Sequence, residues 1–172
     1  MNSRQKFKAS LEHTDPGKIV VDFSSTAVTG IHVLAVENLR KYFSLPEKPV
    51  KVIEPYQMLG ELEPDLMNII GIDVIGISPR KNMFGIENND FKEFRTFWGQ
   101  EVLVPGGFRT KYDKNGDLLI YPEGDTSAFP SARMPKASYF FDTIIRQPII
   151  DDTRLNPEDN IEEFKIFSQE DI

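Results

Sequence analysis

The sequence predicts an α/β fold with an antiparallel, β-rich insertion in its second half. Residues 19–23 are a short β-branched run, followed by the hydroxyl-rich stretch 24–30 and a helical pattern over residues 31–43. Uninterrupted apolar runs are typical of strands in parallel sheets, and strand, loop and helix together make half of a βαβ unit. From about Phe91 onward, short β-rich stretches alternate with Gly and Pro, which is typical of antiparallel strands.

The amino-terminal residues 3–12 are expected to form a short helix. Ser3 can cap this helix, and Phe7 and Leu11 lie one turn apart. The Asp-Pro-Gly turn at residues 15–17 then leads the chain into the first predicted strand.

The helix predicted over residues 31–43 is amphipathic. Its apolar stripe comprises Ile31, Leu34, Ala35, Leu39 and either Tyr42 or Phe43. The side chains expected to face away are Glu37, Asn38, Arg40 and Lys41.

Three further elements are expected in the first half of the chain. Residues 49–53 predict an edge strand, because prolines flank and begin it. Residues 63–71 give the clearest helix pattern, with Pro64 at the first helical position and Gly71 where the chain must turn out. Residues 72–77 predict a second buried strand of the parallel type.

The second half is expected to contain short strands joined by tight turns. The β-rich stretches are residues 98–104, 107–112, 117–121 and 137–141. Asn115-Gly116 between two of them predicts a hairpin turn, because these residues tolerate a positive φ.

The chain is expected to be a single, incomplete domain in three parts. Residues 1–90 hold the first β/α units, residues 91–145 the insertion, and residues 146–172 an acidic segment. The last of these ends with Ser168 followed by acidic residues, which is how a helix begins. We therefore expect a helix that is truncated at its first turn.

Composition excludes several classes of function. The chain has 172 residues and a net charge of −7, which argues against nucleic acid or an anionic membrane surface as a partner. It has no cysteine, so a disulfide scaffold, a Cys-ligated metal and a thiol nucleophile are excluded. It has neither a signal-peptide pattern nor an apolar run of membrane-spanning length, so a cytoplasmic protein is expected.

The loop after the first predicted strand is the first candidate site. Asp22 would place a carboxylate at the strand end, where it could accept a proton as a catalytic group or accept hydrogen bonds from the loop amides. Ser24, Ser25, Thr26 and Thr29 could line a substrate or anion site at the amino end of the following helix, or serve as turn and cap residues.

Two further residues are candidates for substrate binding. His32 lies in the first turn of the predicted helix, where a neutral imidazole could be a ligand or a hydrogen-bond donor; the alternative is a solvated helix residue. Arg80 ends the second predicted strand and could bind a carboxylate or phosphate. We identify no metal-ligand set.

The order of these segments resembles a known family. Arg4-Gln5-Lys6-Phe7-Lys8-Ala9-Ser10-Leu11, then Pro16, then the run ending in Asp22-Phe23, resembles the opening of the uroporphyrinogen decarboxylase superfamily. Met67-Asn68-Ile69-Ile70-Gly71-Ile72-Asp73-Val74-Ile75-Gly76 resembles the family's second β/α step. Phe97-Trp98-Gly99 and the β-rich region continue the resemblance more loosely.

The resemblance implies a partial (β/α)8 barrel of the TIM type, limited to the amino-terminal β/α units. Some members of the superfamily decarboxylate the acetate arms of a porphyrinogen without a cofactor. Others move methyl groups between corrinoid carriers and thiols such as coenzyme M, using zinc. The implied partners are a tetrapyrrole, a corrinoid or a small methyl donor, together with a complementary chain that supplies the rest of the barrel.

The sequence departs from the decarboxylases at two places. Their arginine-rich loop is replaced by the hydroxyl-rich stretch 24–30, with no arginine before Arg40, and no carboxylate lies between Asp73 and Glu87. The zinc ligands of the methyltransferases lie in the later half of the barrel and include cysteines, which this chain lacks. The hydroxyl-rich loop is more similar to the methyltransferase-like branch.

The sequence therefore predicts the amino-terminal fragment of a corrinoid-dependent methyl-transfer enzyme, inactive by itself and without a cofactor of its own. Two alternatives remain open. One is a decarboxylase-type lyase in which Arg80, Arg95 or Arg109 replaces the missing arginines. The other is a non-catalytic binding or assembly module.

Overall fold

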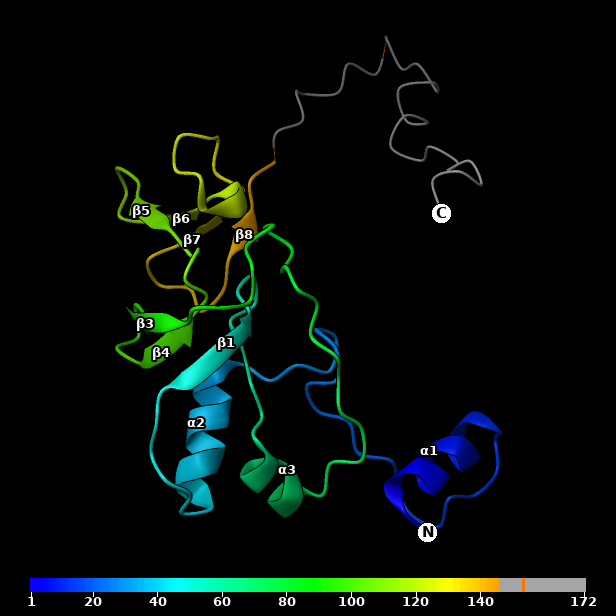
Figure 1. Ribbon diagram of the computed structural model, residues 1–172. Helices are drawn as coiled ribbons and strands as arrows, with labels where there is room; N and C mark the ends of the chain where they lie inside the picture. Colours follow the sequence, from blue (N-terminus) through cyan, green and yellow to red (C-terminus); the bar gives the residue numbers. More distant parts are fainter. Residues whose placement is uncertain (146–152, 154–172) are drawn as a thin grey trace.

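The computed structural model describes residues 1–145 and Thr153 (Figure 1). Its helices are α1 (Ser3–Leu11), α2 (Val33–Tyr42) and α3 (Pro64–Ile70), with a short 3-10 turn, η1 (Pro122–Gly124). Its strands are β1 (Val50–Glu54), β2 (Leu59–Gly60), β3 (Lys92–Arg95), β4 (Glu101–Val104), β5 (Thr110–Tyr112), β6 (Leu118–Ile120), β7 (Ala132–Met134) and β8 (Asp142–Thr143). The acidic segment and the truncated helix predicted within residues 146–172 lie outside the described residues, apart from Thr153.

The strands form two four-stranded sheets. The first has the order β2-β1-β4-β3, in which β1 and β4 are parallel, with Val50 opposite Val102, and the other pairs are antiparallel. The second has the order β5-β6-β7-β8 and is antiparallel throughout. The fold is therefore mixed α/β, and the described strands form no closed barrel.

The predicted strands of the second half are correct in part. An antiparallel hairpin joins β5 and β6 at Asn115-Gly116, and Gly116 has the positive φ of 83° that the turn requires. The strand predicted over residues 137–141 is wrong, because β7 and β8 flank that stretch instead. The edge strand predicted at residues 49–53 is β1, which lies inside its sheet between β2 and β4.

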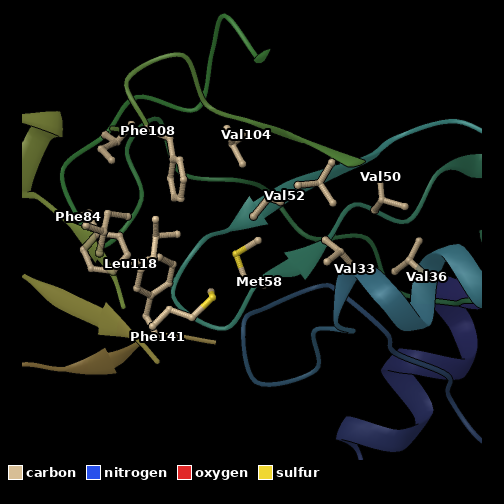
Figure 2. Close-up of a cluster of buried hydrophobic side chains, with 14 of the residues drawn as sticks. Val33, Val36, Val50, Val52, Met58, Phe84, Val104, Phe108, Leu118 and Phe141 are labelled. Atoms are coloured by element: carbon tan, nitrogen blue, oxygen red, sulfur yellow. The ribbon is translucent and has the colours of Figure 1, made fainter. Parts of the chain in front are cut away.

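One hydrophobic core joins α2 to both sheets (Figure 2). Val33 and Val36 of α2 pack over β1, and Phe108 and Phe141 extend the core to the second sheet, with ring centroids 6.4 Å apart. Val52 and these four side chains are buried, so their apolar surface is removed from water. This removal is the main driving force of folding.

The amphipathic stripe of α2 differs from the predicted one. Val33 and Val36 are buried, whereas Ala35 is exposed. Arg40, expected to face solvent, is 4% exposed. Its guanidinium donates to both carboxylate oxygens of Asp65, each at 3.0 Å, and to Glu63 at 3.1 Å, so α2 is held to the start of α3. These acidic partners, which local periodicity does not reveal, make the burial of a charged residue possible.

The strands predicted at residues 19–23 and 72–77 are absent as regular strands. The two segments nevertheless lie side by side and run in the same direction (Figure 1). The Asp73 amide donates to the Val21 carbonyl at 2.8 Å, and a Cβ on Gly76 would lie 2.0 Å from the Ser25 carbonyl oxygen. A parallel pair without further strands beside it has too few hydrogen bonds to form a stable ladder.

The pair of segments is also poorly covered. Ile19, Ile75 and Ile77 are 85%, 75% and 98% exposed, contrary to the predicted burial on both faces. Helix α1 is attached to this pair through Lys6, whose Nζ lies 2.5 Å from Asp73 Oδ2. Hydrogen bonds from Lys6, the Val21 amide and Ser3 lower the pKa of Asp73 to about 2.

The described helices are short. α2, the longest of them, has 10 residues, and none of these helices has the length and apolar character needed to cross a membrane.

Candidate functional site

A pocket of about 310 Å³ lies between the hydroxyl-rich loop, residues 24–30, and the end of the second of the two paired segments, residues 72–79. Its lining residues come from the loop, from the end of β1 and β2, and from the chain after Gly76; they are Ser24, Ser25, Thr26, Ala27, Gly30, Ile53, Glu54, Leu59, Gly76, Ile77, Ser78, Pro79, Asn82 and Met83. A volume of this size is sufficient for a small ligand or for one arm of a larger one. The loop that the sequence singled out therefore forms one wall of a cavity.

Asp22 shapes this loop from within. Its Oδ1 accepts hydrogen bonds from the Ser25 amide at 3.1 Å and the Thr29 hydroxyl at 3.3 Å, and its Oδ2 accepts from the Ser25 hydroxyl. The Ser24 amide closes the loop by donating to the Thr29 carbonyl at 2.8 Å. Both carboxylate oxygens are thus occupied by loop donors, so the geometry matches the structural role of Asp22 rather than proton transfer.

Ser24 has an unusual backbone and an unpartnered hydroxyl. Its φ is 71°, in the left-handed region that non-glycine residues seldom adopt. Its Oγ is buried without a hydrogen-bond partner in the described residues. Strained conformations of this kind are concentrated at ligand sites, where the surrounding structure holds them in place.

Asn82 carries a second unpartnered polar atom on the same pocket. The residue is 9% exposed, and its Oδ1 accepts from the amides of Phe84 at 3.0 Å and Ile86 at 3.2 Å. These bonds fix the orientation of the side-chain amide, and Nδ2 is left without a partner in the described residues. A buried donor without a partner costs about 1–3 kcal/mol, which a ligand that accepts from it would offset.

Glu54 supplies the charge of the pocket. Its two carboxylate oxygens accept from the amides of Tyr56 and Gln57, each at 2.8 Å, at the turn that follows β1. No other ionisable side chain is among the described lining residues. The pocket therefore disfavours anionic groups.

Asn82 and Glu54 were missed by the sequence analysis. Asn82 begins a turn, and its side-chain oxygen accepts a hydrogen bond from the Phe84 amide of that turn. The Asn-Met-Phe-Gly sequence at residues 82–85 is a recognisable signal for such a turn. Glu54 had no comparable signal, because its place on the pocket depends on the pairing of β1.

The other predicted site residues do not line the pocket. Arg80 is exposed and pairs with Glu87 at 3.1 Å. Thr29, which is not a lining residue, supports Asp22. His32 caps α2 by accepting the Leu34 amide on Nδ1, and its Nε2 lies 3.0 Å from the Tyr139 carbonyl. Because Nδ1 accepts from the Leu34 amide, Nε2 is the nitrogen placed to donate to the Tyr139 carbonyl, and both ring nitrogens have a structural role.

The part of the chain that the structure describes contains no cluster of three or more His, Asp or Glu side chains placed to hold a metal ion.

Comparison with family models, curated proteins and solved structures found no match to this chain. Its function must therefore be argued from its own residues and geometry.

Proposed function

We propose that the chain is part of a uroporphyrinogen-decarboxylase-like enzyme and that the pocket beside Ser24 and Asn82 belongs to its substrate-binding rim. The observation that carries this proposal is that residues 19–25 and 72–79 are neighbours with the same direction and that their following loops share one cavity. In β/α barrels, ligands bind in the loops that follow parallel strands.

The exposed apolar side chains of the two segments support the same proposal. Ile19, Ile75 and Ile77 are largely exposed, although their residue types are typical of buried strands. In the functional protein we expect further β/α units to pair with these segments and to cover these side chains. The regular parallel strands predicted from the sequence would then form.

The charge of the pocket favours the corrinoid-linked methyl-transfer branch over the decarboxylases. A porphyrinogen carries several carboxylates, and binding them requires cationic side chains. None of Arg80, Arg95 and Arg109 is among the described lining residues. A corrinoid instead carries uncharged amides around its ring. A site whose charge comes from Glu54 is better suited to the second ligand.

The zinc ion used by that branch does not fit this chain. The sequence has no cysteine and two histidines, and His32 is committed to capping α2. We therefore assign no catalytic step to these residues. Their role is to bind and orient one part of a ligand, while residues outside this chain would hold any metal.

Binding of two tetrapyrrole-type probes to the full chain tests the proposal. Hydroxocobalamin and uroporphyrin should be compared by equilibrium dialysis with detection by absorbance. We expect hydroxocobalamin to bind, and the substitution Thr26→Trp, which fills the pocket, to weaken its binding at least about ten-fold. Val28→Trp is the matched control, because Val28 is an exposed residue of the same loop that does not line the pocket.

Preferential binding of uroporphyrin would favour the decarboxylase alternative. Binding of neither probe would favour a non-catalytic module. Equal effects of Thr26→Trp and Val28→Trp would show that hydroxocobalamin binds elsewhere.

A further inference from the structure

The pocket has an uneven set of hydrogen-bonding groups. Ser24 Oγ and Asn82 Nδ2 are two of the three buried side-chain atoms without a partner in the described residues, and both belong to its wall. Asn82 Nδ2 can only donate, and the Ser24 hydroxyl can donate as well. Glu54 can only accept when ionised, and each of its oxygens retains a lone pair beyond the amide that it binds. The wall thus combines two free donors with one anionic acceptor.

We propose that this pocket binds the primary carboxamide at the end of a short apolar arm. This inference rests on the proposed function, namely that the pocket binds part of a small molecule. The carboxamide oxygen accepts from Asn82 Nδ2 and the Ser24 hydroxyl, and the carboxamide NH₂ donates to Glu54. Ile53, Leu59 and Ile77 among the lining residues contact the apolar arm.

Other polar end groups match the wall less well. A carboxylate could accept from Asn82 and Ser24, but it would lie beside the charge of Glu54 without a compensating cation. An ammonium or amidinium group could pair with Glu54, but it has no acceptor for the two donors. The carboxamide is uncharged and has an oxygen that accepts and an NH₂ group that donates. It can therefore pair both with the two donors and with the Glu54 carboxylate.

Ligand access to the donors requires a small movement of the wall. Ser24 Oγ and Asn82 Nδ2 are both covered by neighbouring atoms. Met83 and Ile77, which line the same pocket, are mostly exposed, so few protein contacts restrain these two side chains. Exposed side chains change rotamer in picoseconds to nanoseconds, which makes this movement fast compared with ligand binding.

Three probes of one shape and different charge test the inference. Benzamide, benzoate and benzamidine share a phenyl ring and differ in their end groups. The ring fits a pocket of about 310 Å³, since an engineered apolar cavity of about 150 Å³ binds benzene. Dissociation constants are measured on the full chain by ligand-detected saturation-transfer NMR, with benzamide expected to bind at least about five-fold more tightly than benzoate or benzamidine.

Variants link that preference to the pocket. Asn82→Asp keeps the oxygen that accepts from Phe84 and Ile86 but removes the donor, so it should weaken benzamide binding at least about five-fold. Asn89→Asp is the charge-matched control, because Asn89 is exposed and outside the pocket. Ser24→Ala, which removes the free hydroxyl alone, should weaken benzamide binding by about three-fold. Glu54→Gln should reduce the discrimination against benzoate, whereas Glu61→Gln should not.

The outcomes separate the inference from the proposed function. Tighter binding of benzoate or benzamidine, in a manner that Thr26→Trp abolishes, would overturn the carboxamide assignment and leave the pocket as a ligand site. Probe binding that none of the pocket variants alters, or no binding of any probe, would overturn both.

Discussion

Two regions of this chain contain similar residues and reach different states. In the region around β1 and β4, the valines at positions 50, 52, 102 and 104 lie in paired strands and are buried. In the paired segments at residues 19–25 and 72–79, Ile19, Ile75 and Ile77 are largely exposed and no regular strand forms. The difference is the number of neighbours: β1 has a hydrogen-bonded strand on each side and a helix over it, whereas the two segments have each other. A β-branched run thus predicts a strand only where a partner is available.

The largest expected contrast is between core truncation and truncation of an exposed isoleucine. Phe141→Ala should lower the free energy of unfolding by about 3–5 kcal/mol, because a fully buried ring leaves a cavity. Ile77→Ala should change it by no more than about 0.5 kcal/mol, because its side chain is 98% exposed. Urea denaturation measures both values. Comparable losses in the two variants would mean that the second segment is packed in solution.

The buried guanidinium of Arg40 should have the next largest effect. Arg40→Ala removes the donors that join α2 to Glu63 and Asp65, and we expect a loss of about 2–3 kcal/mol, since these partly exposed carboxylates can be rehydrated. Lys41→Ala, beside it, removes an exposed pair with Glu37 and should cost less than about 0.5 kcal/mol. Equal losses in urea denaturation would contradict the burial of Arg40.

Acid should release α1 from the paired segments. The pKa of Asp73 is lowered to about 2 from an ordinary value of 3.8, so its interactions stabilise the folded state fully above about pH 4. This contribution is lost as the pH falls from about 4 through about 2. We expect amide exchange in α1 to accelerate over this range, once corrected for intrinsic exchange. Asp73→Asn should remove this pH dependence, and an unchanged pH profile in that variant would contradict it.

Replacing the exposed isoleucines of the second segment should have the smallest effect on stability but a clear effect on self-association. Ile75→Lys combined with Ile77→Lys should leave the urea midpoint nearly unchanged but reduce self-association of the chain, measured by analytical ultracentrifugation. Tyr112→Lys, at an exposed position of β5, is the control. If the wild-type chain sediments as a monomer at high concentration, the exposed faces of the two segments do not drive association.

Local sequence patterns correctly predicted the elements that are determined by residues close together in the sequence. The helix at residues 63–71 is α3, with Pro64 in its first turn and Gly71 in the left-handed conformation that ends it. The hairpin at Asn115-Gly116 is likewise confirmed. The hydroxyl-rich loop, which the sequence marked as a candidate site, lines a pocket together with Ser78 and Pro79.

The remaining features depend on contacts between distant residues. β1 pairs with β4, about fifty residues later in the chain, and no local pattern specifies that choice. The burial of Arg40 follows from two acidic partners, Glu63 just before α3 and Asp65 in its first turn. Glu54 lines the pocket because the pairing of β1 brings it there. Asn82 was the exception, since its turn sequence gave a local signal.

The parallel pairing of β1 with β4 ties the two halves of the chain together. β3 and β4 come from the stretch that the sequence marks as an insertion, yet they complete the sheet on which α2 packs. Cutting the gene at residue 90 to obtain a smaller version would expose one side of β1 and uncover Val50 and Val52. The β-rich stretch therefore cannot be removed as a unit. A shortened version of this chain must keep residues 92–104, which contain β3 and β4.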